Sequence, residues 1–398
     1  MSKSTACAEP PAAWPRSDWG QCLFSGAAGV LLLHVERASR GRSTWATVEQ
    51  WATVVCRDPL YAHPDTCGLF RGVPAVTFAL HQSAVPDHQQ ALSHLDRQLV
   101  SIAHSRLEAA HARMSHGELP TLGEFDLIRG LTGLGVCALR RNLRALLTEV
   151  LEYLVALSMP VQVKGEPLPG WWTSNGPDDR PPPHPDGGHS NLGMAHGIAG
   201  PLALLATAAR RGMVVAGQFD AIARICQVFD RFCGSLPLGY GWPGLLRLSE
   251  WRSGVLDPGH QPERPSWCYG LSGVARALQL AALATNDREQ LKQIELAFAH
   301  ALQDESLMAR LDNPFLCHGW AGLLLSGRRI ADSASHMDIH AALSGLEARL
   351  AASVQACPAD ATAGLLDGPA GLELLALETE EPTQPTSGWD SCLLVAQS

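Results

Sequence analysis

Two kinds of apolar stretch alternate along the chain. The first kind follows a short Gly-x-x-Gly element and is apolar on nearly all sides, as in GIAGPLALLATAA from Gly197 onward. The second kind is amphipathic, with apolar residues at helical spacing, as in residues 44–56, 88–110 and 288–302. We therefore expect buried helices after the glycine elements and half-exposed helices between them.

The glycine element occurs seven times, at intervals of 46 to 73 residues. Its copies begin at Gly26, Gly72, Gly130, Gly197, Gly270, Gly319 and Gly368, and the second copy ends in Ala75 in place of glycine. The shortest interval holds two helices and two turns, so each repeat predicts a helical hairpin. The pattern predicts an all-α fold for residues 1–398, a single α/α toroid (barrel) of seven helical hairpins with inner and outer helix rings.

The glycines themselves have a structural explanation. A residue without a side chain lets the backbone turn tightly and lets neighbouring inner helices approach closely at the mouth of the barrel. We favour this explanation over a role in binding a ligand.

Two long loops interrupt the repeat, at residues 160–192 and 234–266, and both are rich in Pro, Gly and Trp. They lead directly into His196 and Cys268, so we expect them to flank the active-site mouth. Their tryptophans are either contact surfaces for a peptide or packing residues that hold the loops on the barrel, and the sequence leaves both open. These tryptophans are Trp171, Trp172, Trp242 and Trp251.

Composition excludes several classes of protein. The net charge is -9, and no basic stripe interleaved with aromatic residues appears, which argues against a nucleic-acid partner. The first twenty residues lack the apolar region of a signal peptide, and nowhere do about 18 apolar residues run together, so we expect a cytoplasmic protein without a membrane segment. Eleven scattered cysteines do not suggest a disulfide framework.

Three glycine elements carry metal-binding side chains directly before the turn. They read Met194-Ala195-His196-Gly197, Trp267-Cys268-Tyr269-Gly270 and Leu316-Cys317-His318-Gly319. Two thiolates and one imidazole from adjacent hairpins suit zinc with an open fourth position, as in a catalytic site. Taken one at a time, these motifs would be explained equally well by buried Cys and His side chains that bind no metal. Their shared position in the repeat is what favours a metal site.

These motifs, in this order, resemble the signatures of the LanC-type lanthipeptide cyclases, and the repeat extends the resemblance over nearly the whole chain. The resemblance implies a Zn²⁺ ion held by Cys268, Cys317 and His318, and a catalytic His196. The family's further catalytic residues map onto Asp126, Arg264 and Tyr269. The chain departs from the family pattern at Ala75 and in the two loops, so substrate preference does not carry over.

Each of these catalytic candidates also has a structural explanation. A histidine beside a glycine turn is often a structural hydrogen-bonding group, although His196 could also handle a proton near neutral pH. Asp126 could orient His196, take up the thiol proton, or simply cap a helix. Arg264 could stabilise an enolate oxygen or be solvated, and Tyr269 could donate a hydrogen bond or pack.

The resemblance implies a stand-alone class I enzyme that adds peptide cysteine thiols to dehydroalanine or dehydrobutyrine, forming lanthionine or methyllanthionine rings. The implied partners are a dehydrated precursor peptide and, in a transient complex, a lanthipeptide dehydratase. The resemblance also allows association with an export complex at the membrane.

Three alternatives stay open. A LanC-like enzyme would add glutathione to dehydrated residues. A zinc prenyltransferase subunit would need a carboxylate ligand, and no motif supplies one in register. A non-catalytic, zinc-containing peptide-binding scaffold would need a fourth protein ligand.

Overall fold

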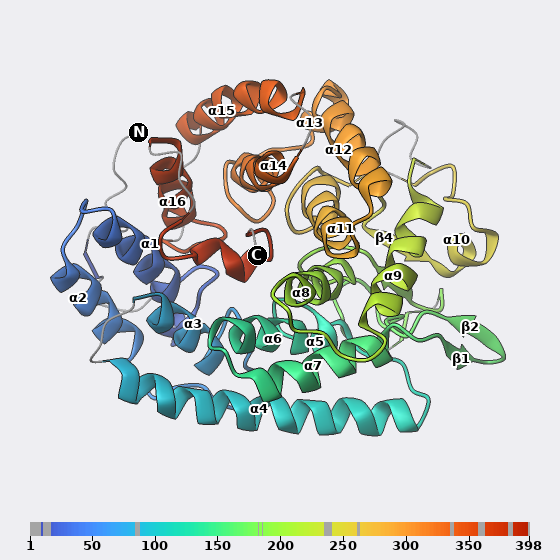
Figure 1. Cartoon of the computed structure of the whole chain (residues 1–398), viewed down its shortest axis with the longest axis horizontal. Helices are drawn as coiled ribbons and strands as arrows, with labels where there is room; N and C mark the ends of the chain where they lie inside the picture. Colours follow the sequence, from blue (N-terminus) through green and yellow to red (C-terminus); the bar gives the residue numbers. More distant parts are fainter. Residues whose placement is uncertain are drawn as a thin grey trace.

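Among the residues described by the computed structural model of the chain, seven helices form the inner ring (Figure 1). Each begins one or two residues after the first glycine of a repeat element, and most of its residues are buried. They are α1 (Ala27–Ser39), α3 (Val73–Ser83), α6 (Leu131–Arg140), α8 (Ala199–Arg210), α11 (Leu271–Thr285), α14 (Trp320–Ser333) and α16 (Pro369–Glu380).

The outer ring is built from longer, half-exposed helices, and those predicted at 44–56, 88–110 and 288–302 are confirmed. Its members are α2 (Trp45–Val55), α4 (Gln89–Ser115), α7 (Arg144–Leu157), α9 (Gln218–Phe232), α12 (Arg288–Leu302) and α15 (Asp338–Ala356). Short elements complete the chain: η2 (Trp19–Gln21), α5 (Leu122–Phe125), α10 (Leu248–Ser253), α13 (Glu305–Met308) and η4 (Trp389–Leu393). The arrangement is the predicted α/α toroid, in which η4 follows the seventh inner helix.

The structure describes most of the chain, with gaps. The described residues are 9–10, 17–83, 88–181, 183–184, 186–234, 241–260, 263–334, 338–356, 363–380 and 385–396. Most of the N-terminal segment judged above for a signal peptide lies outside these ranges, as do short parts of both long loops. Within them, every helix is too short or too polar to cross a lipid bilayer.

The inner helices meet through the segments just before their glycines. Backbone hydrogen bonds link successive repeats: Cys268 N donates to Cys317 O at 3.2 Å, and Cys317 N donates to Leu366 O at 3.1 Å. Leu365 N donates to Leu23 O at 3.3 Å, which joins the last repeat to the first. These bonds close the ring at its mouth.

Glycine is required where the helices pack this closely. A Cβ atom at Gly322 would lie 2.0 Å from Leu316 O, within its own repeat, and 3.1 Å from the Trp267 side chain of the preceding repeat. At Gly29 a Cβ atom would lie 2.8 Å from Leu365 N of the last repeat. Since such distances exclude any side chain, the close approach expected from the sequence explains the motif.

The C-terminal segment lies in the centre of the ring (Figure 1). The Trp267 indole donates to Leu393 O at 3.0 Å, and Arg276 Nε of α11 donates to Val395 O at 2.9 Å. On α14, buried Arg329 pairs with Asp390 at 2.7 Å and with Glu378 at 2.8 Å. The buried ion pair between Arg329 and Asp390 therefore ties this segment to α14, and the hydrogen bond from Arg276 ties it to α11.

The two long loops are joined by a short β-ribbon that the sequence did not predict. Strands β1 (Val161–Val163) and β2 (Glu166–Leu168) form a hairpin within the first loop. Strand β3 (His189–Asn191), from the end of the first loop, pairs antiparallel with β4 (Leu245–Arg247) of the second.

Most of the loop tryptophans face inward. Trp171, Trp172 and Trp242 are at most 3% exposed. The Trp171 indole donates to Ser190 Oγ at 2.8 Å, and Trp251 stacks on Phe232. The packing explanation therefore holds for Trp171, Trp172 and Trp242, while Trp251 is partly exposed.

Replacing Arg329 with methionine should destabilise the fold strongly. The substitution leaves the buried carboxylates of Glu378 and Asp390 without their cation, which typically costs about 3–5 kcal/mol. Urea unfolding followed by circular dichroism measures the change. Arg349→Met, which removes a surface pair with Glu305, should cost about 1 kcal/mol or less. Equal losses in the two variants would contradict the anchoring role of Arg329.

Candidate functional site

Cys268, Cys317 and His318 converge at the mouth of the barrel. Both cysteines stand two residues before the first glycine of their repeats, and the bond from Cys268 N to Cys317 O holds these positions side by side. One ligand atom from each of the three residues lies within 4.8 Å of the others. The cysteines are buried and His318 is partly exposed.

The three side chains interact directly. The pKa of the Cys268 thiol lies well below its usual value because Cys317 donates a hydrogen bond to it and because His318 lies beside it. The pKa of Cys317 is raised, since its proton is held by the Cys268 sulfur, and that of His318 is raised by its contact with the same sulfur at 3.4 Å. This arrangement favours a thiolate at Cys268.

The donor set fits a zinc ion. Two sulfurs and one imidazole nitrogen are ligands that zinc prefers, and three protein ligands leave a fourth position open. Within the ranges that the structure describes, no fourth His, Cys, Asp or Glu belongs to this group. The arrangement therefore has the composition of a catalytic rather than a closed structural site.

His196 and Asp126 form a second pair beside the cluster. His196 Nδ1 donates to Asp126 Oδ2 at 2.7 Å, and this carboxylate is completely buried. Its other oxygen accepts from the backbone N–H groups of Arg129 at 2.6 Å and Gly130 at 2.8 Å. Asp126 thus fixes the turn before α6 with one oxygen and the imidazole with the other, which leaves His196 Nε2 as the ring nitrogen for proton exchange.

Tyr269 and Arg264 complete the set predicted from the sequence. The Tyr269 hydroxyl accepts a hydrogen bond from Asn191 Nδ2 at 3.0 Å, and its ring lies 6.4 Å from that of His196. Burial raises the pKa of Tyr269 to about 12, so the hydroxyl keeps its proton. Arg264 is half-exposed and lies 3.5 Å from Asp312.

A single pocket of about 410 Å³ is lined by six of the seven predicted residues. These six are His196, Arg264, Cys268, Tyr269, Cys317 and His318. Asp126 does not line the pocket but accepts a hydrogen bond from His196. The structure therefore brings the whole predicted set together.

Sequence reasoning missed Asp367. It stands directly before Gly368, in the register of His196 and His318, and its Oδ1 lies 3.7 Å from His318 Nε2. The expectation that no carboxylate lies in register was therefore wrong, and the repeat alignment could have revealed it. Asp367 lies on the side of the imidazole away from Cys268, where a carboxylate commonly orients a metal-binding histidine.

Two further residues were also missed. Asn191 holds Tyr269, and Glu263, whose pKa is raised by burial, lines the pocket beside Arg264. Neither lies in a glycine element, so no repeat signal marks them.

Comparison with known proteins places these observations in a family. The family model described as "Lanthionine synthetase C-like protein" matches residues 17–394. The "Nisin biosynthesis protein NisC" of Lactococcus lactis subsp. lactis is 26% identical over 134 residues, which span 34% of this chain and 31% of that protein. The solved structure of "Nisin cyclase" superposes with a TM-score of 0.80 at 19% identity, covering 96% of this chain and 93% of that one. From the family match over almost its full length, the chain belongs to the lanthionine synthetase C-like family.

Proposed function

We propose that this protein is a zinc-dependent lanthipeptide cyclase in which the whole chain acts as one domain. One observation carries the proposal: a Cys, Cys, His donor set with an open position shares a pocket with His196, whose Nδ1 donates to the buried carboxylate of Asp126. The first group suits thiol activation, and the second suits proton transfer. Ring closure by addition of a thiol to a dehydrated residue needs both.

The reaction joins two side chains of one peptide. A cysteine sulfur forms a bond to the β-carbon of dehydroalanine or dehydrobutyrine, and the carbon–carbon double bond becomes single. The thiol proton leaves and the α-carbon gains a proton, so the mass of the peptide does not change. The product is a lanthionine or methyllanthionine thioether ring.

Cys268, Cys317 and His318 would hold the zinc ion. A bound zinc ion lowers the pKa of a substrate thiol, which is about 8.5 when unperturbed, so that the reactive thiolate forms at neutral pH. Asp367 would orient His318 from behind.

His196 would protonate the α-carbon of the intermediate enolate. Its Nδ1–H donates to Asp126, so the proton that His196 would give to the α-carbon is one carried by Nε2. The buried location of Asp126, fixed by two backbone N–H groups, keeps the imidazole in one orientation.

Tyr269 and Arg264 would stabilise the negative charge on the enolate oxygen. Tyr269 retains its proton and can donate it in a hydrogen bond, while the half-exposed guanidinium of Arg264 lines the same pocket.

We further propose that the substrate is a dehydrated precursor peptide, supplied through a transient complex with a lanthipeptide dehydratase in the cytoplasm. The long loops would flank the active-site mouth.

The direct test of this function is ring closure in a synthetic peptide that carries one dehydroalanine and one cysteine. The zinc-loaded protein should remove the free thiol at unchanged mass, faster than the uncatalysed background. Cys317→Ala should lose zinc and this activity while its helical circular dichroism persists, because the core is shared by all repeats. Thiol alkylation with mass spectrometry and metal analysis supply the readouts.

Cys226→Ala is the matched control, since Cys226 is a buried cysteine on α9 outside the pocket. It should retain zinc and activity. Full zinc occupancy in Cys317→Ala would contradict the assigned metal site. A mass gain of one glutathione in the presence of that tripeptide, without ring closure, would instead favour a glutathione-adding enzyme.

Replacing His196 with asparagine should slow ring closure by about 10²- to 10⁴-fold, the usual effect of losing a general acid or base. The asparagine amide can still donate to Asp126, so zinc content and peptide binding should persist. Single-turnover kinetics with saturating enzyme measure the chemical step. A rate within a few-fold of the parent would leave His196 only a structural role.

A further inference from the structure

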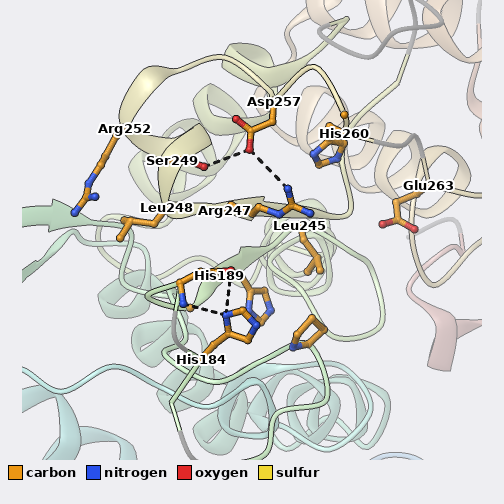
Figure 2. Close-up of a pocket in the computed structure, with 14 residues that line it drawn as sticks. His184, His189, Leu245, Arg247, Leu248, Ser249, Arg252, Asp257, His260 and Glu263 are labelled. Carbon is orange, nitrogen blue, oxygen red and sulfur yellow. Dashed lines mark hydrogen bonds and ion pairs between the residues drawn. The ribbon is translucent and has the colours of Figure 1, made fainter.

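The two long loops enclose a second hollow, of about 870 Å³, beside the pocket at the barrel mouth. Its lining comes from both loops, with His184 and His189 on one side and Arg247, Leu248 and neighbouring residues of the second loop on the other (Figure 2). No catalytic or metal role proposed above uses it.

The β3–β4 ribbon connects this hollow with the catalytic pocket. In an antiparallel ribbon, directly opposite residues share a face, so the pairs His189–Arg247 and Asn191–Leu245 lie on one face. The pair between them, Ser190 and Leu246, lies on the other face and is fully buried.

The first face runs from one site to the other. His189, Arg247 and Leu245 line the hollow, and Asn191 donates to the Tyr269 hydroxyl in the catalytic pocket. Glu263 lines both the hollow and the pocket. The two spaces are therefore neighbours along a continuous surface.

His189 offers a polar atom suited to a ligand. The residue is 5% exposed, and its Nδ1–H donates to Asn175 O at 3.1 Å. Its Nε2 atom has no hydrogen-bond partner among the described residues. Burial lowers the pKa of His189, so the ring is neutral and Nε2 is an acceptor. A buried acceptor without a partner is unfavourable, and a donor from a ligand would satisfy it.

Three of the basic groups that line the hollow have acidic partners. Arg252 pairs with Glu166 at 2.7 Å, His260 with Glu250 at 2.7 Å, and Arg247 lies 3.7 Å from Asp257. A strongly charged ligand would have to displace these partners. Leu245 and Leu248 add apolar surface. A neutral chain with N–H donors and some apolar side chains, such as an extended peptide, matches this lining better than an anion does.

We propose that the hollow is a docking subsite for an extended stretch of the same peptide whose cysteine reacts at the barrel mouth. His189 Nε2 would accept a peptide N–H, and Leu245 and Leu248 would contact an aliphatic side chain. This inference rests on the proposed cyclase function and assigns part of its substrate recognition to the loops.

The test compares a five-residue peptide, with dehydroalanine and cysteine at its ends, with versions extended by ten residues at either end. The parent protein should show a lower KM for at least one extended peptide than for the short one. His189→Asn keeps a donor for Asn175 O, but its shorter side chain places no acceptor where Nε2 stood, so it should raise that KM about tenfold. The short peptide should be cyclised with unchanged KM and kcat.

Arg180→Ala, on the first loop and outside the hollow, is the matched control and should behave like the parent. As a second measurement, p-benzoylphenylalanine at exposed position 247 should cross-link to the extended peptide. The same probe at exposed Val214, outside the hollow, should not.

The outcomes separate the two proposals. Failure of the parent to cyclise any of the peptides would overturn the cyclase function. Cyclisation of all of them, with no KM advantage from either extension and no cross-link at position 247, would overturn the docking subsite and leave the function standing. A KM increase in His189→Asn for the short peptide as well would show that His189 acts on the catalytic pocket itself.

Discussion

The structure depends on the close contact between neighbouring inner helices at their glycine elements. At Gly29 a Cβ atom would lie 2.8 Å from Leu365 N of the last repeat, and at Gly322 it would lie 2.0 Å from Leu316 O of its own repeat and 3.1 Å from Trp267 of the preceding one. This contact allows backbone hydrogen bonds between repeats, and the bond from Leu365 to Leu23 closes the ring. Because the residues just before the glycines then face a common centre, the same constraint that closes the barrel also gathers the chemistry at its mouth.

This arrangement explains why the group of Cys268, Cys317 and His318 and the pair of Asp126 and His196 are neighbours although they are far apart in the sequence. Cys268 and Cys317 are adjacent because their backbones are bonded, not because of any local motif. Asp126 reaches His196 because the turn before α6 is fixed by its own carboxylate. The buried pairs of Arg329 with Glu378 and Asp390 hold the C-terminal segment in the centre of the ring. These side chains are therefore held by the backbone contacts of the inner ring.

The sequence predicts the parts that repeat and misses those that do not. The seven glycine elements reveal the toroid, and their register places Cys268, Cys317, His318 and His196 at one mouth. Asp367 obeys the same register, but a carboxylate before a turn looks like an ordinary cap, so it was overlooked. The β3–β4 ribbon, Asn191 and His189 depend on pairing between residues more than 50 positions apart in the chain, and single-sequence periodicity carries no information about such pairing. The inward burial of Trp171 and Trp172 likewise depends on tertiary packing.

The central claim is that three residues of this chain hold zinc and leave one position for a substrate thiol. X-ray absorption at the zinc edge tests it most directly, on the zinc-loaded protein with and without a cysteine-containing peptide. Without the peptide, we expect the zinc ion to have two sulfur ligands, one imidazole and one light-atom ligand from solvent. With the peptide, we expect a third sulfur ligand. A coordination shell completed by four protein ligands and unchanged by the peptide would contradict it.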